Sequence, residues 1–209
     1  MTMVTEKKGI KETFYISHGS SMISIDDSFP VRHFLKLFRQ KVLSEKPKAI
    51  LIISGHWETT EPVVNAVSGP NETIYDFYGF PDVMYKLKYP APGAVKLAIR
   101  VKELLWKSAF GSVHVDKKCG LDHRVWVPLM LMYLEPDIPV CQLSIQTHKD
   151  AAHHRLGKAL ASLKDDSVLI IGSGAATHNL RMINRQGGDY GAPWIYEFDN
   201  QGGAAGREI

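Results

Sequence analysis

The sequence has little of several features that would assign it to a class at once. It contains only two cysteines in 209 residues, too few for a disulfide framework. Its longest apolar runs fall far short of the roughly 20 residues that cross a membrane. No apolar signal-peptide core follows the polar first residues, 1–13. These absences predict a soluble, reduced, cytoplasmic protein with no membrane partner.

Blocks of like charge are absent as well. The 25 basic and 22 acidic residues are spread along the chain, and the formal net charge is +3. We therefore expect no nucleic-acid partner. The hydrophobic content of 44% is enough for one well-buried domain, and we expect a single domain over residues 1–209. The oligomeric state stays open.

Apolar strand-like runs alternate with helical patterns. The continuous apolar run at residues 49–54 is typical of a strand buried on both faces. The alternation predicts an α/β fold, a single-domain αβα sandwich with a largely parallel or mixed central sheet. We expect strands at 13–17, 49–54, 62–67, 139–145 and 167–171, and we expect the last strand to break at Gly172-Ser173-Gly174. We expect helices that begin at Pro30 and that cover 94–107, 125–134 and 151–163. The apolar side of the helix at 94–107 is expected to consist of Val95, Ala98, Ile99 and Leu105.

Residues 69–93 follow neither pattern. They are rich in glycine, proline and aromatic residues. A loop of this length in a compact domain is usually functional or disordered, and the aromatic content argues against disorder. Two interpretations stay open: a lid or pocket wall for an aromatic ligand, or an irregular flap packed on the core.

Four histidines follow strand-like runs or lie in turns of small residues: His18, His56, His123 and His178. The carboxyl ends of parallel strands line one crevice, so these side chains are expected to meet there. Neutral imidazole binds metals and titrates near neutral pH, which indicates a metal or proton-transfer site. The alternative for each is an incidental turn histidine.

His56 gives the strongest signal of the four, because a buried strand ending in a polar pair needs partners. Three roles are open for Glu58: a metal ligand, a carboxylate that orients an imidazole, or a surface group. We favour the second role. Asp122 is a candidate helix cap, which would place His123 at the start of a helix. Two histidines with a third ligand suit Fe(II) or Zn(II), and the spacing does not choose between them.

Taken together, four motifs resemble the class III extradiol ring-cleaving dioxygenases, especially the plant-type DOPA 4,5-dioxygenase group, whose product feeds betalain pigments. The likeness runs from about residue 13 to 198. The motifs are Tyr15-Ile16-Ser17-His18-Gly19-Ser20, Ile53-Ser54-Gly55-His56-Trp57-Glu58, Gly120-Leu121-Asp122-His123 with Trp126-Val127-Pro128-Leu129, and Gly172-Ser173-Gly174 followed by Thr177-His178-Asn179-Leu180.

The resemblance implies an oxidoreductase that inserts both atoms of O₂ beside the diol of a catechol, and L-DOPA is the substrate we expect. It implies that His18 and His56 bind the metal, normally Fe(II), with Zn(II) described in bacterial relatives. His178 would act as acid/base or as an additional metal neighbour. His123 would line the pocket and contact oxygen or the diol.

The chain departs from the family pattern at two places. Arg124 follows His123 where the family usually has a small residue, and it either alters substrate choice or points outward. Family members also continue with a His-Pro-Trp-Pro-type segment and a later histidine, the third metal ligand, which nothing after Trp194 matches. We therefore expect a C-terminally shortened chain. The alternatives are a non-catalytic homologue and a zinc hydrolase using His18, His56 and Glu58.

Overall fold

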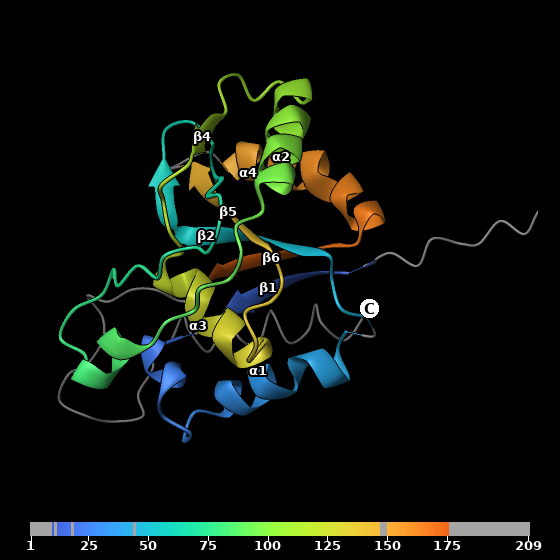
Figure 1. The fold of residues 1–209 in the computed structure, drawn as a ribbon. Helices are drawn as coiled ribbons and strands as arrows, with labels where there is room; N and C mark the ends of the chain where they lie inside the picture. Colours follow the sequence, from blue (N-terminus) through green and yellow to red (C-terminus); the bar gives the residue numbers. More distant parts are fainter. Residues whose placement is uncertain (1–9, 11, 18, 44, 147–149, 176–209) are drawn as a thin grey trace, which may run out of the picture. The chain divides into compact units, whose positions relative to one another are not determined.

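The computed structural model describes residues 10, 12–17, 19–43, 45–146 and 150–175. The chain divides into two compact units, Met1–Gly174 and Ala175–Ile209, and every element below belongs to the first (Figure 1). His18, His178 and the tail at 202–209 lie outside the described residues. The single domain over residues 1–209 stays a prediction.

A six-stranded mixed sheet forms the centre of the first unit. Its spatial order is β1-β6-β2-β5-β3-β4. The first four of these strands are parallel to one another, β3 runs antiparallel to β5, and β4 is parallel to β3. The strands are β1 (Thr13–Ser17), β2 (Ala49–Thr59), β3 (Val63–Asn65), β4 (His114–Asp116), β5 (Val140–Gln146) and β6 (Val168–Gly174).

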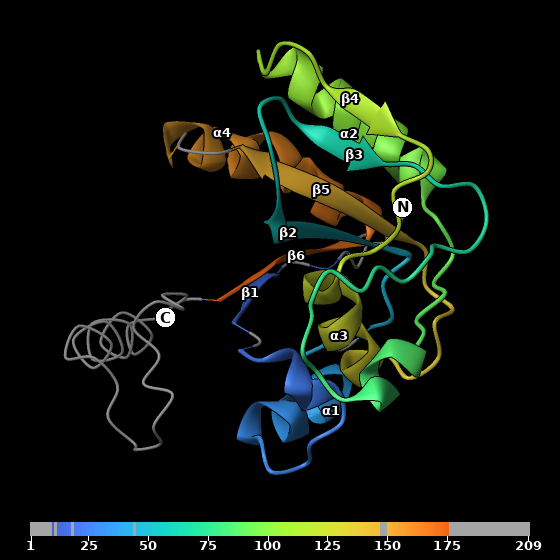
Figure 2. The ribbon, with the colours of Figure 1, turned by 90° about the vertical axis from the view of Figure 1, so that its left-hand side faces the viewer.

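Helices cover both faces of the sheet. The helices α1 (Pro30–Lys41) and α3 (His123–Met132) lie on one face, and α2 (Val95–Lys107) and α4 (Asp150–Leu160) lie on the other (Figures 1 and 2). This arrangement confirms the predicted αβα sandwich. Three short 3₁₀ helices complete the described elements: η1 (Ser21–Ser24), η2 (Asp82–Lys86) and η3 (Ala161–Asp166).

Each face of the central strands faces its own apolar core. In β2, Ile50 and Ile52 pack with α1 and α3, while Leu51 packs with α2 and α4, and all three side chains are fully buried. Successive residues of a strand point to opposite faces, so an unbroken apolar run is what a strand between two helix layers requires. Burying one such side chain contributes about 1.5–3 kcal/mol.

Three details differ from the sequence-based expectations. β6 does not break at Gly172, because it stays paired with β1 and β2 through Ser173. The side chain of Tyr15 covers Gly172 and Gly174, and a Cβ at Gly174 would lie 3.0 Å from the Tyr15 hydroxyl. Ile99 is 51% exposed, and Leu97 and Val101 take the buried positions of α2 instead. The three-residue strand β4 was not predicted.

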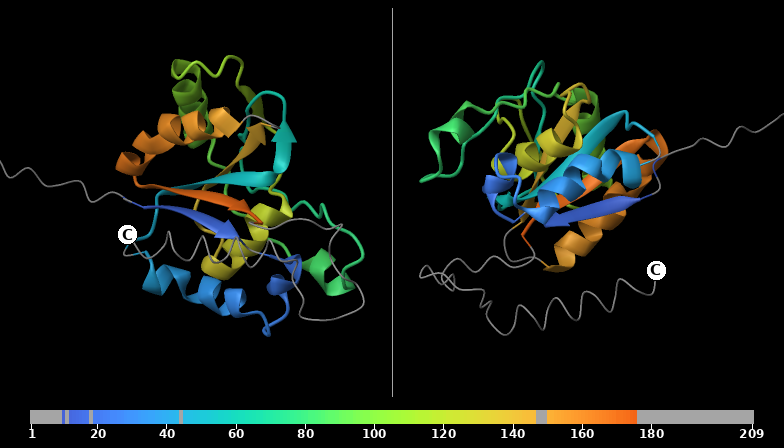
Figure 3. Two further views of the ribbon diagram at one scale, coloured as in Figure 1. Left: turned by 180° about the vertical axis from the view of Figure 1, so that it is seen from behind. Right: turned by 90° about the horizontal axis from the view of Figure 1, so that it is seen from below.

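The segment 69–93 lies beside α3, as the views from the side, behind and below show (Figures 2 and 3). It contains one short 3₁₀ helix, η2. Within the described residues, no helix combines the length and apolar character that a membrane crossing requires.

Candidate functional site

A bulge at the end of β2 presents His56. The pairing of β2 with β5 is regular up to Ser54 and resumes only at Glu58, so Gly55, His56 and Trp57 lie outside the ladder. The backbone N–H of His56 donates to Ser54 Oγ at 3.1 Å. Bulges re-aim side chains and are common beside active sites. The strand itself runs on to Thr59, so the prediction that it ends at His56 was wrong.

The N-terminus of α3 presents the second imidazole. Asp122 caps the helix by accepting a hydrogen bond from the backbone N–H of Arg124 at 2.9 Å, as predicted. Gly120 lies two residues earlier, where any Cβ would collide with the carbonyl oxygen of Glu72. This close approach lets segment 69–93 pair with the chain just before α3. His123 follows the cap and is only 8% exposed.

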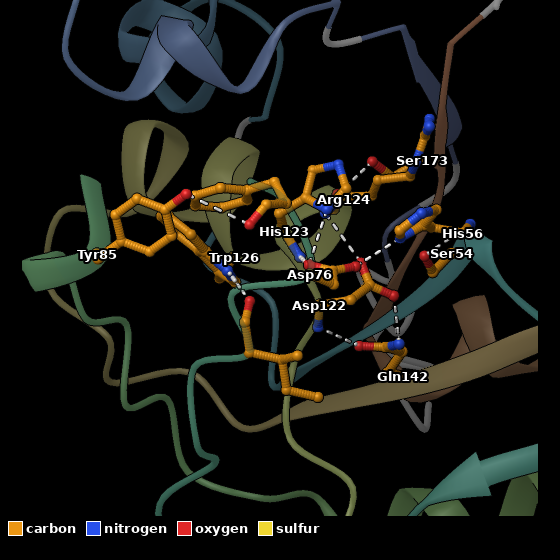
Figure 4. Close-up of polar contacts among 12 residues, drawn as sticks. Ser54, His56, Asp76, Tyr85, Asp122, His123, Arg124, Trp126, Gln142 and Ser173 are labelled. Carbon is orange, nitrogen blue, oxygen red and sulfur yellow. Dashed lines mark hydrogen bonds and ion pairs between the residues drawn. The ribbon is translucent and has the colours of Figure 1, made fainter. Parts of the chain in front are cut away.

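Segment 69–93 brings a carboxylate to these two histidines. The backbone N–H of Ile74 donates to the carbonyl oxygen of Leu121 at 2.9 Å. The indole N–H of Trp126 donates to the carbonyl oxygen of Ile74 at 3.0 Å. These bonds fix the chain immediately before Asp76. The carboxylate of Asp76 then lies between His56 and His123 (Figure 4).

Asp76 contacts both imidazoles through their Nδ1 atoms. Its Oδ2 lies 2.5 Å from His56 Nδ1, and its Oδ1 lies 2.8 Å from His123 Nδ1. Its Oδ1 also accepts the backbone N–H of His123 at 3.0 Å. The two rings are 4.8 Å apart between centroids and meet edge to face. Residues more than sixty positions apart in the sequence therefore form one cluster.

The protonation of Asp76 follows from these contacts. Burial alone would raise the pKa of its carboxyl group, but the hydrogen bonds and charge of His123 and the hydrogen bond of His56 outweigh burial and lower the pKa to about 2. Asp76 is therefore a carboxylate at neutral pH. A carboxylate acceptor favours the tautomer of each histidine that carries its proton on Nδ1.

The cluster has the donors that a divalent metal requires. His56, Asp76 and His123 each offer a ligand atom, and these atoms lie within 4.8 Å of one another. The contacts with Asp76 are made at Nδ1, so the Nε2 atom of each ring lies on the side away from this carboxylate, an orientation that carboxylates commonly impose on metal-binding histidines. Imidazole and carboxylate donors suit both Fe(II) and Zn(II).

A buried polar network holds the two histidine-bearing elements together. Asp122 Oδ2 accepts a hydrogen bond from Gln142 Nε2 at 2.7 Å, and its backbone N–H donates to Gln142 Oε1 at 3.1 Å. Ser54 also donates to Asp122, and burial raises the pKa of this carboxyl group. Because Ser54 accepts the His56 N–H as well, the network links β2, β5 and α3 directly beneath the site (Figure 4).

Aromatic rings border the cluster on one side. Phe77 lies 5.8 Å from the His123 ring and 6.2 Å from Trp126, measured between centroids. Tyr85 reaches the carbonyl oxygen of Phe77 at 3.4 Å and lies on this side in Figure 4. Segment 69–93 is thus packed on the core, as one of the two interpretations held. Whether it also walls a ligand pocket stays a prediction.

The structure places some of the predicted site residues and adds one. His56 and His123 come together, whereas His18 and His178 lie outside the described residues. Asp76 was not predicted, although a single carboxylate between Tyr75 and Phe77 in an aromatic run was a usable signal. The expectation that Glu58 orients an imidazole stays a prediction. Asp76 is the carboxylate that the structure places against His56.

Comparison with known proteins identifies the family. The model of the catalytic LigB subunit of aromatic ring-opening dioxygenase matches residues 12–202. The chain belongs to this family. The LigB dioxygenases are metal-dependent enzymes, consistent with a site in which a carboxylate orients two imidazoles.

Individual relatives agree with the LigB assignment. The chain is 59% identical over 192 residues to the 4,5-DOPA dioxygenase extradiol of Beta vulgaris, covering 91% of this chain and 71% of that protein. It is 48% identical over 197 residues to the protein of the same name from Portulaca grandiflora, covering 94% and 72%. A crystal structure of an uncharacterised Escherichia coli K12 protein matches with a TM-score of 0.68 at 35% identity, covering 89% and 68%.

Proposed function

We propose that this LigB-family enzyme cleaves the ring of a catechol with O₂ at the extradiol position, and that its substrate is L-DOPA in betalain-type biosynthesis. The observation that carries the proposal is the pair of imidazoles held on one carboxylate, His56 and His123 on Asp76, at the carboxyl edge of the sheet. The 59% identity to a Beta vulgaris protein named 4,5-DOPA dioxygenase extradiol supports the substrate.

Fe(II) is the metal we propose, with Zn(II) as the alternative. His18 and His56 are the proposed ligands, and His178 is a further ligand or an acid/base group. Asp76 would orient His56 so that its Nε2 faces the metal, because its carboxylate occupies the Nδ1 side of the ring. A bound Fe(II) ion would stabilise the deprotonated diol and hold it next to O₂.

The chain's own residues would supply proton transfer and orientation. His123 is buried, and Asp76 holds its ring at Nδ1, so Nε2 is the ring nitrogen that would accept a proton from the diol and return it later. The ring of Phe77 borders this histidine and packs against Trp126, and these rings would exclude water beside an aromatic substrate. The fixed geometry supplies part of the rate by orientation.

The test is oxygen consumption by the full chain with Fe(II) and L-DOPA, together with the appearance of a yellow ring-opened product. His56→Ala should abolish both and lower the iron content of the purified protein. His114→Ala changes an exposed histidine on β4 and is the matched control. Full activity of His56→Ala would remove the metal assignment. No oxygen uptake by the iron-loaded wild type would contradict the proposed reaction.

A further inference from the structure

Arg124 is a buried cation at the site. It is the second residue of α3, directly after His123, and is only 6% exposed. Its backbone is fixed from two sides: its N–H donates to Asp122 Oδ1 at 2.9 Å, and its carbonyl oxygen accepts the Ser173 hydroxyl at 2.5 Å. Of the two alternatives for Arg124, the one in which the side chain points outward is therefore contradicted.

The guanidinium group has no counterion among the residues that the structure describes. Its Nε is buried without a hydrogen-bond acceptor. The nearby carboxylates are otherwise engaged, because Asp76 contacts the two imidazoles and Asp122 accepts from Ser54, Gln142 and its own helix. A buried charge without a partner is strongly destabilising, so a site that retains one normally binds an ion of opposite charge.

The surroundings favour an anion. Arg124 lies in the first turn of a ten-residue helix, where the helix dipole places partial positive charge. Figure 4 shows the side chain extending toward Ser173, on the His56 side of the cluster and away from Tyr85. The planar guanidinium matches a carboxylate, which it binds through two parallel hydrogen bonds.

We propose that Arg124 binds the carboxylate of the substrate's side chain and so makes the enzyme selective for catechols that carry an acid. This inference rests on the proposed function for the identity of the substrate. L-DOPA has a carboxylate, and dopamine is the same catechol without it. The aromatic ring would lie by His123 and Phe77, and the acidic end would reach the guanidinium.

The binding test uses ligands that cannot be cleaved. Binding of 3-phenylpropionate and of phenethylamine to the full chain is measured by calorimetry without added iron. Wild type should bind the acid at least about tenfold more tightly than the amine, the smallest effect expected for a charge-assisted pair. Arg124→Gln should remove that preference. Arg124→Lys keeps the positive charge but not the planar guanidinium group, so it should keep only part of the preference for the acid.

Arg100→Gln is the matched control, because Arg100 lies on α2 on the opposite face of the sheet and should leave binding unchanged. Equal binding of acid and amine by wild type, or binding of neither, would overturn the inference. An unchanged preference in Arg124→Gln would overturn it too. Thermal unfolding of each variant separates a binding defect from a folding defect.

The turnover test separates this inference from the proposed function. With Fe(II) and O₂, Arg124→Gln should raise KM about tenfold or more for L-DOPA and 3,4-dihydroxyphenylpropionate, but not for dopamine. If wild type cleaves no catechol yet shows Arg124-dependent acid binding, the proposed function fails and the inference stands. If Arg124→Gln and Arg124→Gly speed turnover of all catechols equally, the side chain merely fills space and the inference fails.

Discussion

The two faces of the sheet are built from different side chains. The face covered by α2 and α4 is mainly aliphatic, with Phe110 as its one buried ring among the described residues. The face covered by α1 and α3 buries four rings, those of Phe38, Tyr89, Trp126 and Tyr133, and the rings of Tyr75 and Phe77 pack against this core. Both faces exclude water, but only the aromatic one borders the candidate site.

The difference shows what aromatic residues add to a core. Aliphatic burial is non-directional and stabilises the sheet without fixing any loop in one conformation. Aromatic side chains add ring geometry and polar atoms that form directed bonds. The Trp126 indole and the Tyr75 hydroxyl both bond to backbone carbonyls of segment 69–93, at 3.0 and 2.6 Å. This face therefore positions a long irregular segment, and with it Asp76.

One substitution on each face tests this comparison most strongly. Trp126→Ala should lower the free energy of unfolding by about 3–5 kcal/mol, and Leu105→Ala on α2 by about 2–5 kcal/mol. Both side chains are fully buried, so the stability losses should overlap. Only Trp126→Ala should also weaken metal binding, because it releases the chain before Asp76. Chemical denaturation and metal titration of the folded variants measure the two effects.

A loss of metal affinity in folded Leu105→Ala equal to that in Trp126→Ala would contradict the proposed difference between the two faces. It would mean that the site responds to general core stability and not to the anchoring of segment 69–93.

Asp76→Ala isolates the carboxylate itself. Both imidazoles would lose the acceptor that holds Nδ1. Metal affinity should fall about 10–100-fold, the usual cost of losing a group that orients a metal-binding histidine. Asp82→Ala changes an exposed carboxylate of the same segment and should have no such effect. Equal metal affinity in Asp76→Ala and wild type would show that the rings are held by other contacts.

The regular parts of the fold could be predicted from the sequence because they follow a repeating pattern. The unbroken apolar run at 49–54 and the helical spacing that begins at Pro30 are both strong local patterns, and the structure has both elements. The strand β4 escaped prediction because three residues are too few to show a period. The end of β6 was misjudged because glycine usually interrupts a strand, whereas here Tyr15 covers the glycines.

The site was only half predictable for a different reason. His56 was found because it follows an apolar run, although the strand continues to Thr59, and His123 was found because it follows a helix-capping aspartate. Asp76 lies in a segment without a period, and its place depends on bonds to Leu121 and Trp126 that no local rule gives. The burial of Arg124 likewise follows from tertiary packing alone.

A smaller effect should follow from the network beneath the site. Asp122→Ala removes the cap of α3 and leaves Gln142, which is 1% exposed, without its acceptor. The free energy of unfolding should fall by about 2 kcal/mol. Asp122→Asn keeps the oxygen that caps the helix but turns an NH₂ donor toward Gln142 Nε2, so it should recover only the part of the loss that the cap accounts for. A loss in Asp122→Asn as large as in Asp122→Ala would assign the effect to the bond with Gln142 and not to the cap.

The smallest effect concerns the exposed start of α1, on the aromatic face. Asp27 lies 2.7 Å from Arg32 Nε and 3.0 Å from Lys36 Nζ, and these hydrogen bonds lower its pKa to about 2. A depressed carboxyl pKa stabilises the folded state fully above the unfolded pKa of about 4, and this stability is lost as the pH falls toward 2. Asp27→Asn should therefore lower Tm near pH 7 and match wild type near pH 2.

Because Asp27 is 67% exposed, the difference should be no more than about 2 °C, and it should shrink in high salt. Thermal unfolding of both proteins across the pH range measures it. A difference that persists at pH 2 would mean that Asp27 acts through its shape and not through its charge. In that case the surface ion pairs of α1 would contribute nothing to the contrast between the two faces.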